Sequence, residues 1–61
     1  MTITQGFDVL VNGIARSFRD LATNAHAAAL VLKTRWPQDK VQIRDRSTGH
    51  VITMLVDGRV G

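Results

Sequence analysis

The sequence predicts an α+β fold in the order ββαββ, with one helix packed on a small antiparallel sheet of two hairpins. An Asn-Gly pair lies between two runs that are rich in β-branched and aromatic residues, which is typical of a hairpin. An alanine-rich segment with apolar residues at helical spacing follows. Two further alternating runs then flank a turn that contains Thr48-Gly49.

The size of the chain limits it to one small domain. It has 61 residues, 44% of them hydrophobic, and no cysteine. A chain of this size buries only about 60% of its unfolded surface, and disulfides cannot reinforce it. We therefore expect a single domain over residues 1–61, ordered over about 6–56, with a tail at 57–61 that frays. A marginal core of this kind favours association with a partner.

The first hairpin is predicted around Asn12-Gly13, because a type I′ turn needs a positive φ at both central residues. A two-residue turn fixes three facing pairs: Val11 with Ile14, Val9 with Arg16, and Phe7 with Phe18. This register places Arg16 on the apolar face. We interpret it as an edge residue whose stem packs while its head reaches solvent, with a ligand or partner contact as the alternative.

The helix is predicted from Asp20 or Thr23 to about Arg35, because Pro37 ends it. Candidate N-caps are Ser17, Asp20 and Thr23. Lys33 and Arg35 suit the last turn. The stripe expected to face the sheet comprises Leu21, Ala25, Ala28, Ala29, Leu32 and Trp36. Leu30 points the opposite way, flanked by Ala27 and Val31.

The second hairpin is predicted from strands at residues 40–44 and 51–56, joined by a turn in which Asp45 pairs with His50. Ile43 then faces Ile52, and Val41 faces Met54. The strand order stays open between 2-1-3-4 and 1-2-4-3.

A shared plan is carried by Gly13, Phe18, Ala25 to Ala29, Trp36-Pro37, and Asp45 with Thr48-Gly49. With these residues the chain resembles the small bacterial ββαββ domains of unknown function. The Glu-Ala pair at the start of such helices is absent. The resemblance implies the ββαββ fold and a bacterial source, and it carries over no catalytic or binding residue.

No residue pattern indicates catalysis or metal binding. The possible metal ligands are His26, His50, Asp20, Asp45 and Asp57, and no pair of them has ligand spacing. No nucleophile, base and orienting group can be assembled either. We therefore expect no enzyme activity, no cofactor, no metal and no small-molecule substrate.

The sequence shows neither a signal peptide nor an apolar run long enough to span a membrane. The start, residues 1–6, has no basic or apolar region of a signal peptide. The longest apolar run, at residues 27–32, is far shorter than the roughly 20 residues that span a bilayer. We therefore expect a cytoplasmic protein with no membrane partner.

Association has the strongest support among the functional hypotheses. The predicted fourth strand is apolar on both faces, and part of the helix back is apolar too. The residues expected to form a partner interface are Leu10, Leu30, Val31, Val51 and Leu55. The first hypothesis is therefore a non-enzymatic interaction module that forms a homodimer.

The alternative hypothesis is a nucleic-acid-binding accessory protein. Its candidate contacts are Arg16, Arg19, Arg44 and Arg46. The net charge of +3 permits this function and does not indicate it. The aromatic residues Phe7, Phe18 and Trp36 are expected in the core, which leaves none to stack on bases. Arginines that converge on the open sheet face would favour this hypothesis, and an apolar strip there would favour the first.

Overall fold

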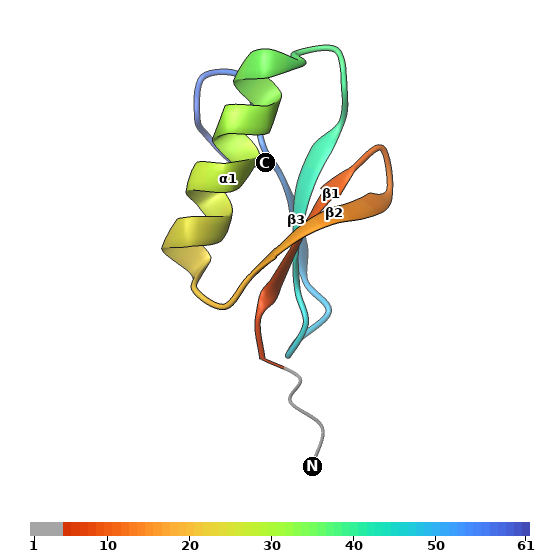
Figure 1. Cartoon of the computed structure of the whole chain (residues 1–61), viewed down its shortest axis with the longest axis vertical. Helices are drawn as coiled ribbons and strands as arrows, with labels where there is room; N and C mark the ends of the chain where they lie inside the picture. Colours follow the sequence, from red (N-terminus) through yellow and green to blue (C-terminus); the bar gives the residue numbers. More distant parts are fainter. Residues whose placement is uncertain (1–4) are drawn as a thin grey trace.

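The computed structural model describes residues 5–61 and contains one four-stranded antiparallel sheet with one helix packed on it (Figure 1). The predicted α+β fold in the order ββαββ is confirmed. The elements are β1 (Phe7–Val11), β2 (Ile14–Arg19), α1 (Ala22–Arg35), β3 (Val41–Asp45) and β4 (Val51–Thr53). The prediction about a signal peptide concerns mainly residues 1–4, which lie outside the described residues.

The strand order is β2-β1-β3-β4, which is one of the two orders that the sequence left open. β1 therefore lies inside the sheet and pairs with β2 on one side and β3 on the other. Ile43 pairs with Ile52, and the Met54 amide donates to the Val41 carbonyl at 2.8 Å, as the second hairpin predicts. The Asp45 amide also donates to the His50 carbonyl at 2.8 Å, which confirms the turn.

The register of the first hairpin differs from the prediction after its first pairs. Val11 pairs with Ile14 as expected, and Asn12 and Gly13 have φ values of 52° and 84°. A bulge then leaves Arg16 without a partner residue, so Val9 pairs with Ser17. One extra residue moves every later side chain of a strand to the opposite face. Beyond the bulge the pairing is Asp8 with Phe18 and Phe7 with Arg19.

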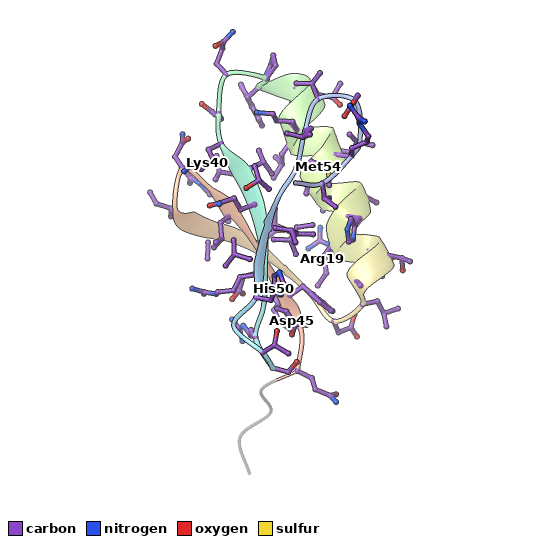
Figure 2. The ribbon with its side chains drawn as sticks, turned by 180° about the vertical axis from the view of Figure 1, so that it is seen from behind. Arg19, Lys40, Asp45, His50 and Met54 are labelled. Carbon is purple, nitrogen blue, oxygen red and sulfur yellow. The ribbon has the colours of Figure 1, made fainter. Side chains whose placement is uncertain are left out.

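The core lies between α1 and one face of the sheet. Its buried members are Val9, Ala25, Ala29, Val41, Ile43 and Met54. Ala25 and Ala29 are fully buried, and their small side chains let the helix axis come close to the strands. Met54 follows β4 and fills the space beside the helix (Figure 2). The predicted stripe is thus correct at its centre, whereas its two ends, Leu21 and Trp36, are 57% and 49% exposed.

The sequence predicts the C-terminal end of α1 correctly, but not the residue that caps its N-terminal end. The helix begins at Ala22, and its N-cap is Leu21, which has no side-chain cap. None of the three predicted cap residues, Ser17, Asp20 or Thr23, has that role. The C-terminal end is as expected, since Lys33 and Arg35 lie in the last turn. The Trp36 amide there donates to the Leu32 carbonyl at 2.9 Å.

The C-terminal segment forms a third, very short hairpin, where the sequence suggests a frayed tail. β4 ends at Thr53, earlier than the predicted strand. The chain then turns around Gly58, whose φ is 89°, and returns beside β4. Thr53 and Gly61 exchange two backbone hydrogen bonds of 2.9 Å. These bonds hold residues 57–61 in place beside the end of α1 (Figure 1).

Candidate functional site

The sheet face opposite α1 holds one buried carboxylate, that of Asp8, which is only 2% exposed. Arg44, on β3, lies beside Asp8, on β1, because the two residues pair across these neighbouring strands. Its Nη2 donates to Oδ2 of Asp8 at 2.9 Å. Arg46 reaches the same group, with Nη2 at 2.9 Å from Oδ1 and Nε at 3.0 Å from Oδ2. Two guanidinium groups therefore share one carboxylate, which satisfies a charge that would be costly to bury alone.

The arrangement fixes the ionisation of Asp8. The hydrogen bond from Arg46 is the largest influence and lowers the pKa of Asp8 below its usual value of 3.8. Burial acts in the opposite direction, and Arg44 adds a further lowering. The carboxylate thus stays negative over the physiological range, and it offsets one of the two positive charges on this face.

Phe18 completes this group, which we call the Asp8 cluster: Gly6, Asp8, Phe18, Arg44 and Arg46. The Arg46 guanidinium lies over the Phe18 ring, 4.7 Å from its centroid. A side chain in place of Gly6 would overlap the Phe18 ring. The predicted place of Phe18, opposite Phe7 on the helix side, is therefore wrong. The cause is the bulge at Arg16, which turns Phe18 to the open face.

The four arginines proposed as nucleic-acid contacts do not converge. Arg44 and Arg46 lie on the open sheet face, where Asp8 binds both. Arg19 folds back along its own strand, with Nη1 donating to the Phe18 carbonyl at 2.8 Å and to Ser17 Oγ at 3.0 Å. Arg16 lies elsewhere, among residues of the helix side. The open face is thus neither an arginine surface nor an apolar strip.

The residues proposed as a partner interface are also divided between surfaces. Leu10 is only 8% exposed, so its expected exposure is wrong. It pairs with Ala15 and Gln42 and belongs to the covered part of the open face. Val51 is 41% exposed and pairs with Arg44 at one end of that face, and Leu55, in the C-terminal hairpin, is 40% exposed. Only Leu30 and Val31, which are 37% and 60% exposed, lie together.

The face of α1 that points away from the sheet is uncharged. Helical spacing places Ala27, Leu30, Val31 and Thr34 on it, and all four are exposed. We call these four residues the outer helix face. A shallow hollow of about 500 Å³ lies over its end, and the charged residue Arg35 lines the edge of this hollow. The turn of the C-terminal hairpin continues this surface, because Gly58 lies against the Leu30 side chain. An ordinary surface helix carries charged residues on this side.

A second hollow, of about 330 Å³, lies between the first hairpin and the end of α1. We call it the Trp36 pocket, and its lining residues are Val11, Arg16, Leu32, Trp36 and Asp39. The sequence did not suggest this group, because Trp36 was expected in the core. The signal that could have indicated it is the proline after Trp36, which ends the helix and turns the indole away from the core stripe.

The two histidines line one hollow at the end of the sheet. His26 and His50 both line a hollow of about 340 Å³, together with Asp45. Figure 2 shows Asp45 and His50 at the end of the sheet where β3 turns toward β4. Asp45 is occupied by its own turn, since Oδ1 accepts from the Ser47 amide at 2.9 Å and from Ser47 Oγ at 2.7 Å. Within residues 5–61, no group of three or more ligand-type side chains could hold a metal ion.

Comparison with known proteins adds no family to this description. No protein-family model, curated protein or solved structure matches the chain. The resemblance to bacterial ββαββ domains therefore stays a prediction. In the described part of the chain, no helix is long and apolar enough to cross a membrane.

Proposed function

We propose that this chain is a small non-enzymatic interaction module that forms a homodimer through the outer helix face. One observation carries the proposal: α1 is apolar on two sides. Ala25 and Ala29 fill the core, whereas Leu30 and Val31, on the outer helix face, are 37% and 60% exposed. An apolar patch that a helix exposes to solvent is typical of a partner interface.

A second copy of the chain is the partner that this surface suits best. In a two-fold dimer the same patch meets itself, and the four residues of the outer helix face carry no charge, with Arg35 at their edge. Ala27 and Thr34 are small enough to let two helices approach closely around Leu30 and Val31. A standard interface buries about 800 Å² on each partner, which is roughly a fifth of the 4294 Å² surface of this chain. The adjoining C-terminal hairpin adds Val56 and Val60, which are 58% and 43% exposed.

Two substitutions test the proposal: each replaces an exposed apolar residue with glutamate, one on the outer helix face and one away from it. Val31 and Ile14 are 60% and 59% exposed, so glutamate at either position leaves the core untouched. We expect Val31→Glu to convert the dimer to a monomer in size-exclusion chromatography, because it buries a charge in the interface. Ile14→Glu, on the first hairpin, keeps the dimer. If both variants elute with the unmodified chain, the outer helix face is not the interface.

Nucleic-acid binding is the second candidate, and a different observation favours it. Among the described residues, Arg16 has no hydrogen bond or ion pair through its guanidinium, unlike the other three candidate arginines. It lines the same hollow as Trp36, whose side chain is half exposed. A free arginine next to an exposed aromatic ring is a combination that binds nucleic acids. Salt-dependent binding of an oligonucleotide would support this function, and no binding at low salt would exclude it.

The proposed setting is the cytoplasm of a bacterium. Support for the compartment comes from a composition without cysteine, which is compatible with a reducing environment. The bacterial source follows only from the resemblance to bacterial ββαββ domains. Expression with a fluorescent tag in a bacterial host, followed by fractionation, would test the location.

A further inference from the structure

We propose that the Trp36 pocket binds one unpaired nucleobase of a single-stranded nucleic acid, with the adjoining phosphates on Arg16. This inference rests on the second candidate function and names both its ligand and its site. It does not depend on dimer formation.

The backbone holds Trp36 firmly while its ring stays accessible. Its amide donates to the Leu32 carbonyl at 2.9 Å, and its carbonyl accepts from the Asp39 amide at 3.0 Å. The side chain is nevertheless 49% exposed. Arg35 lies over the ring at 5.5 Å from the centroid and does not line the pocket. The exposed part of the indole that lines the pocket is the surface on which we expect a flat base to stack.

The loop after α1 is fixed in place by hydrogen bonds to the helix and to the first hairpin. Nζ of Lys33 donates to the carbonyls of Pro37 at 3.1 Å and Asp39 at 2.8 Å. The loop is also attached to the tip of the first hairpin, since Asn12 and Lys40 exchange hydrogen bonds of 2.8 and 3.0 Å. These bonds position Trp36, on the helix end, opposite Arg16, on β2. A site that is formed before the ligand arrives binds with a smaller loss of entropy.

The charge around the pocket suits a polyanion that carries planar rings. Arg16 lines it, and Arg35 lies over the indole ring. Lys40, labelled in Figure 2, directly follows the lining residue Asp39 in the chain. Asp39 is the one carboxylate among the lining residues. Phosphates are attracted by the three cations, while Val11 and Leu32 give an apolar floor for a ring. The hollow of about 330 Å³ is large enough for one base that has left its stack.

The chain provides its own reporter for this site. It contains one tryptophan and no tyrosine, so intrinsic fluorescence comes from Trp36. We would titrate the full chain with a ten-residue oligothymidylate at low salt, using Arg16→Gln as the test variant. Arg59→Gln is the matched control, because it removes the same charge from a side chain that is 81% exposed on the C-terminal hairpin. A second titration would use an oligonucleotide of equal length with abasic sites.

Quenching of Trp36 fluorescence is expected for the unmodified chain and for Arg59→Gln. Arg16→Gln should weaken binding about tenfold, and the slope of log affinity against log salt should fall by about 0.7, the value for one phosphate of a single strand. The abasic oligonucleotide should bind more weakly and quench little. Equal weakening by both arginine variants, or equal quenching by the abasic strand, would overturn the proposed site.

Fluorescence anisotropy of a labelled oligothymidylate separates the site from the function. Binding that raises anisotropy without quenching Trp36 would overturn the Trp36 pocket and leave nucleic-acid binding to another surface. Absence of both signals at low salt would overturn the site and the second candidate function together.

Discussion

Arg46 binds the carboxylate of Asp8 and lies over the ring of Phe18 at the same time. Its Nη2 is 2.9 Å from Oδ1 of Asp8, and its guanidinium is 4.7 Å from the ring centroid. One side chain thus joins β1, β2 and the end of β3 on a sheet face that no helix covers. The Asp8 cluster therefore acts as a small second centre of packing, and it is polar where the main core is apolar.

Replacing Asp8 with asparagine should destabilise the fold. The substitution keeps the size of the side chain but removes the charge to which Arg44 and Arg46 donate. Hydrogen bonds to charged groups contribute about 1.5–3 kcal/mol, so we expect the free energy of unfolding to fall by about that amount. Asp20→Asn is the control, because Asp20 is exposed, and it should stay within about 0.5 kcal/mol. Urea denaturation of both variants measures the difference.

Acid should weaken the fold below about pH 4. The folded pKa of Asp8 is lowered, chiefly by Arg46, and that of Asp45 is lowered, chiefly by Ser47. The unfolded chain then binds more protons in this range, so stability rises with pH there and is lost as pH falls. Thermal melts from pH 7 to pH 2 should show this decline, with a shallower decline for Asp8→Asn. A parallel decline in both proteins would mean that Asp8 does not contribute.

Alanine at Gly6 should cost more than alanine at Gly13. Gly6 has a φ of 127°, a conformation almost confined to glycine, and the Phe18 ring occupies the space of a side chain. We expect a loss of about 1–3 kcal/mol from the backbone alone, with an added cost from moving the ring. Gly13 has a φ of 84° with open space around it, so its loss is about 1–2 kcal/mol. Equal losses in chemical denaturation would show that Phe18 does not press on Gly6.

Enlarging Ala29 should separate the helix from the sheet. Ala29 is fully buried against the strands, and a leucine there adds three carbons to a filled space. Overpacking of this kind costs about 1–3 kcal/mol. Ala22→Leu, at the exposed start of α1, should have little effect. The midpoint of thermal unfolding, recorded by circular dichroism, compares the two variants.

Local patterns in the sequence were enough to predict most of the fold. The Asn12-Gly13 turn, the helix end before Pro37 and the pairing of Ile43 with Ile52 each depend on a few neighbouring residues. The strand order could not be chosen, because both orders satisfy the same local patterns. The bulge at Arg16 was missed for a similar reason, since an extra residue in a strand leaves no clear mark in an alternating pattern.

The candidate surfaces were harder to predict than the fold, because one residue of register decides which face a side chain takes. The bulge moved Phe18 to the open face, where it meets Arg46. Leu10 was assigned correctly to the face opposite the helix, yet its neighbours there cover it. Leu30 and Val31 were predicted well, because helical spacing alone places them on the far side of α1.

Sedimentation equilibrium of the unmodified chain tests the proposed homodimer most directly. The monomer mass is 6.7 kDa, so a dimer has twice that mass, about 13.4 kDa. We predict a concentration-dependent shift between these two masses over the micromolar range, and a single species of 6.7 kDa for Val31→Glu. A mass of 6.7 kDa for the unmodified chain at every concentration would contradict the proposal that the outer helix face joins two copies.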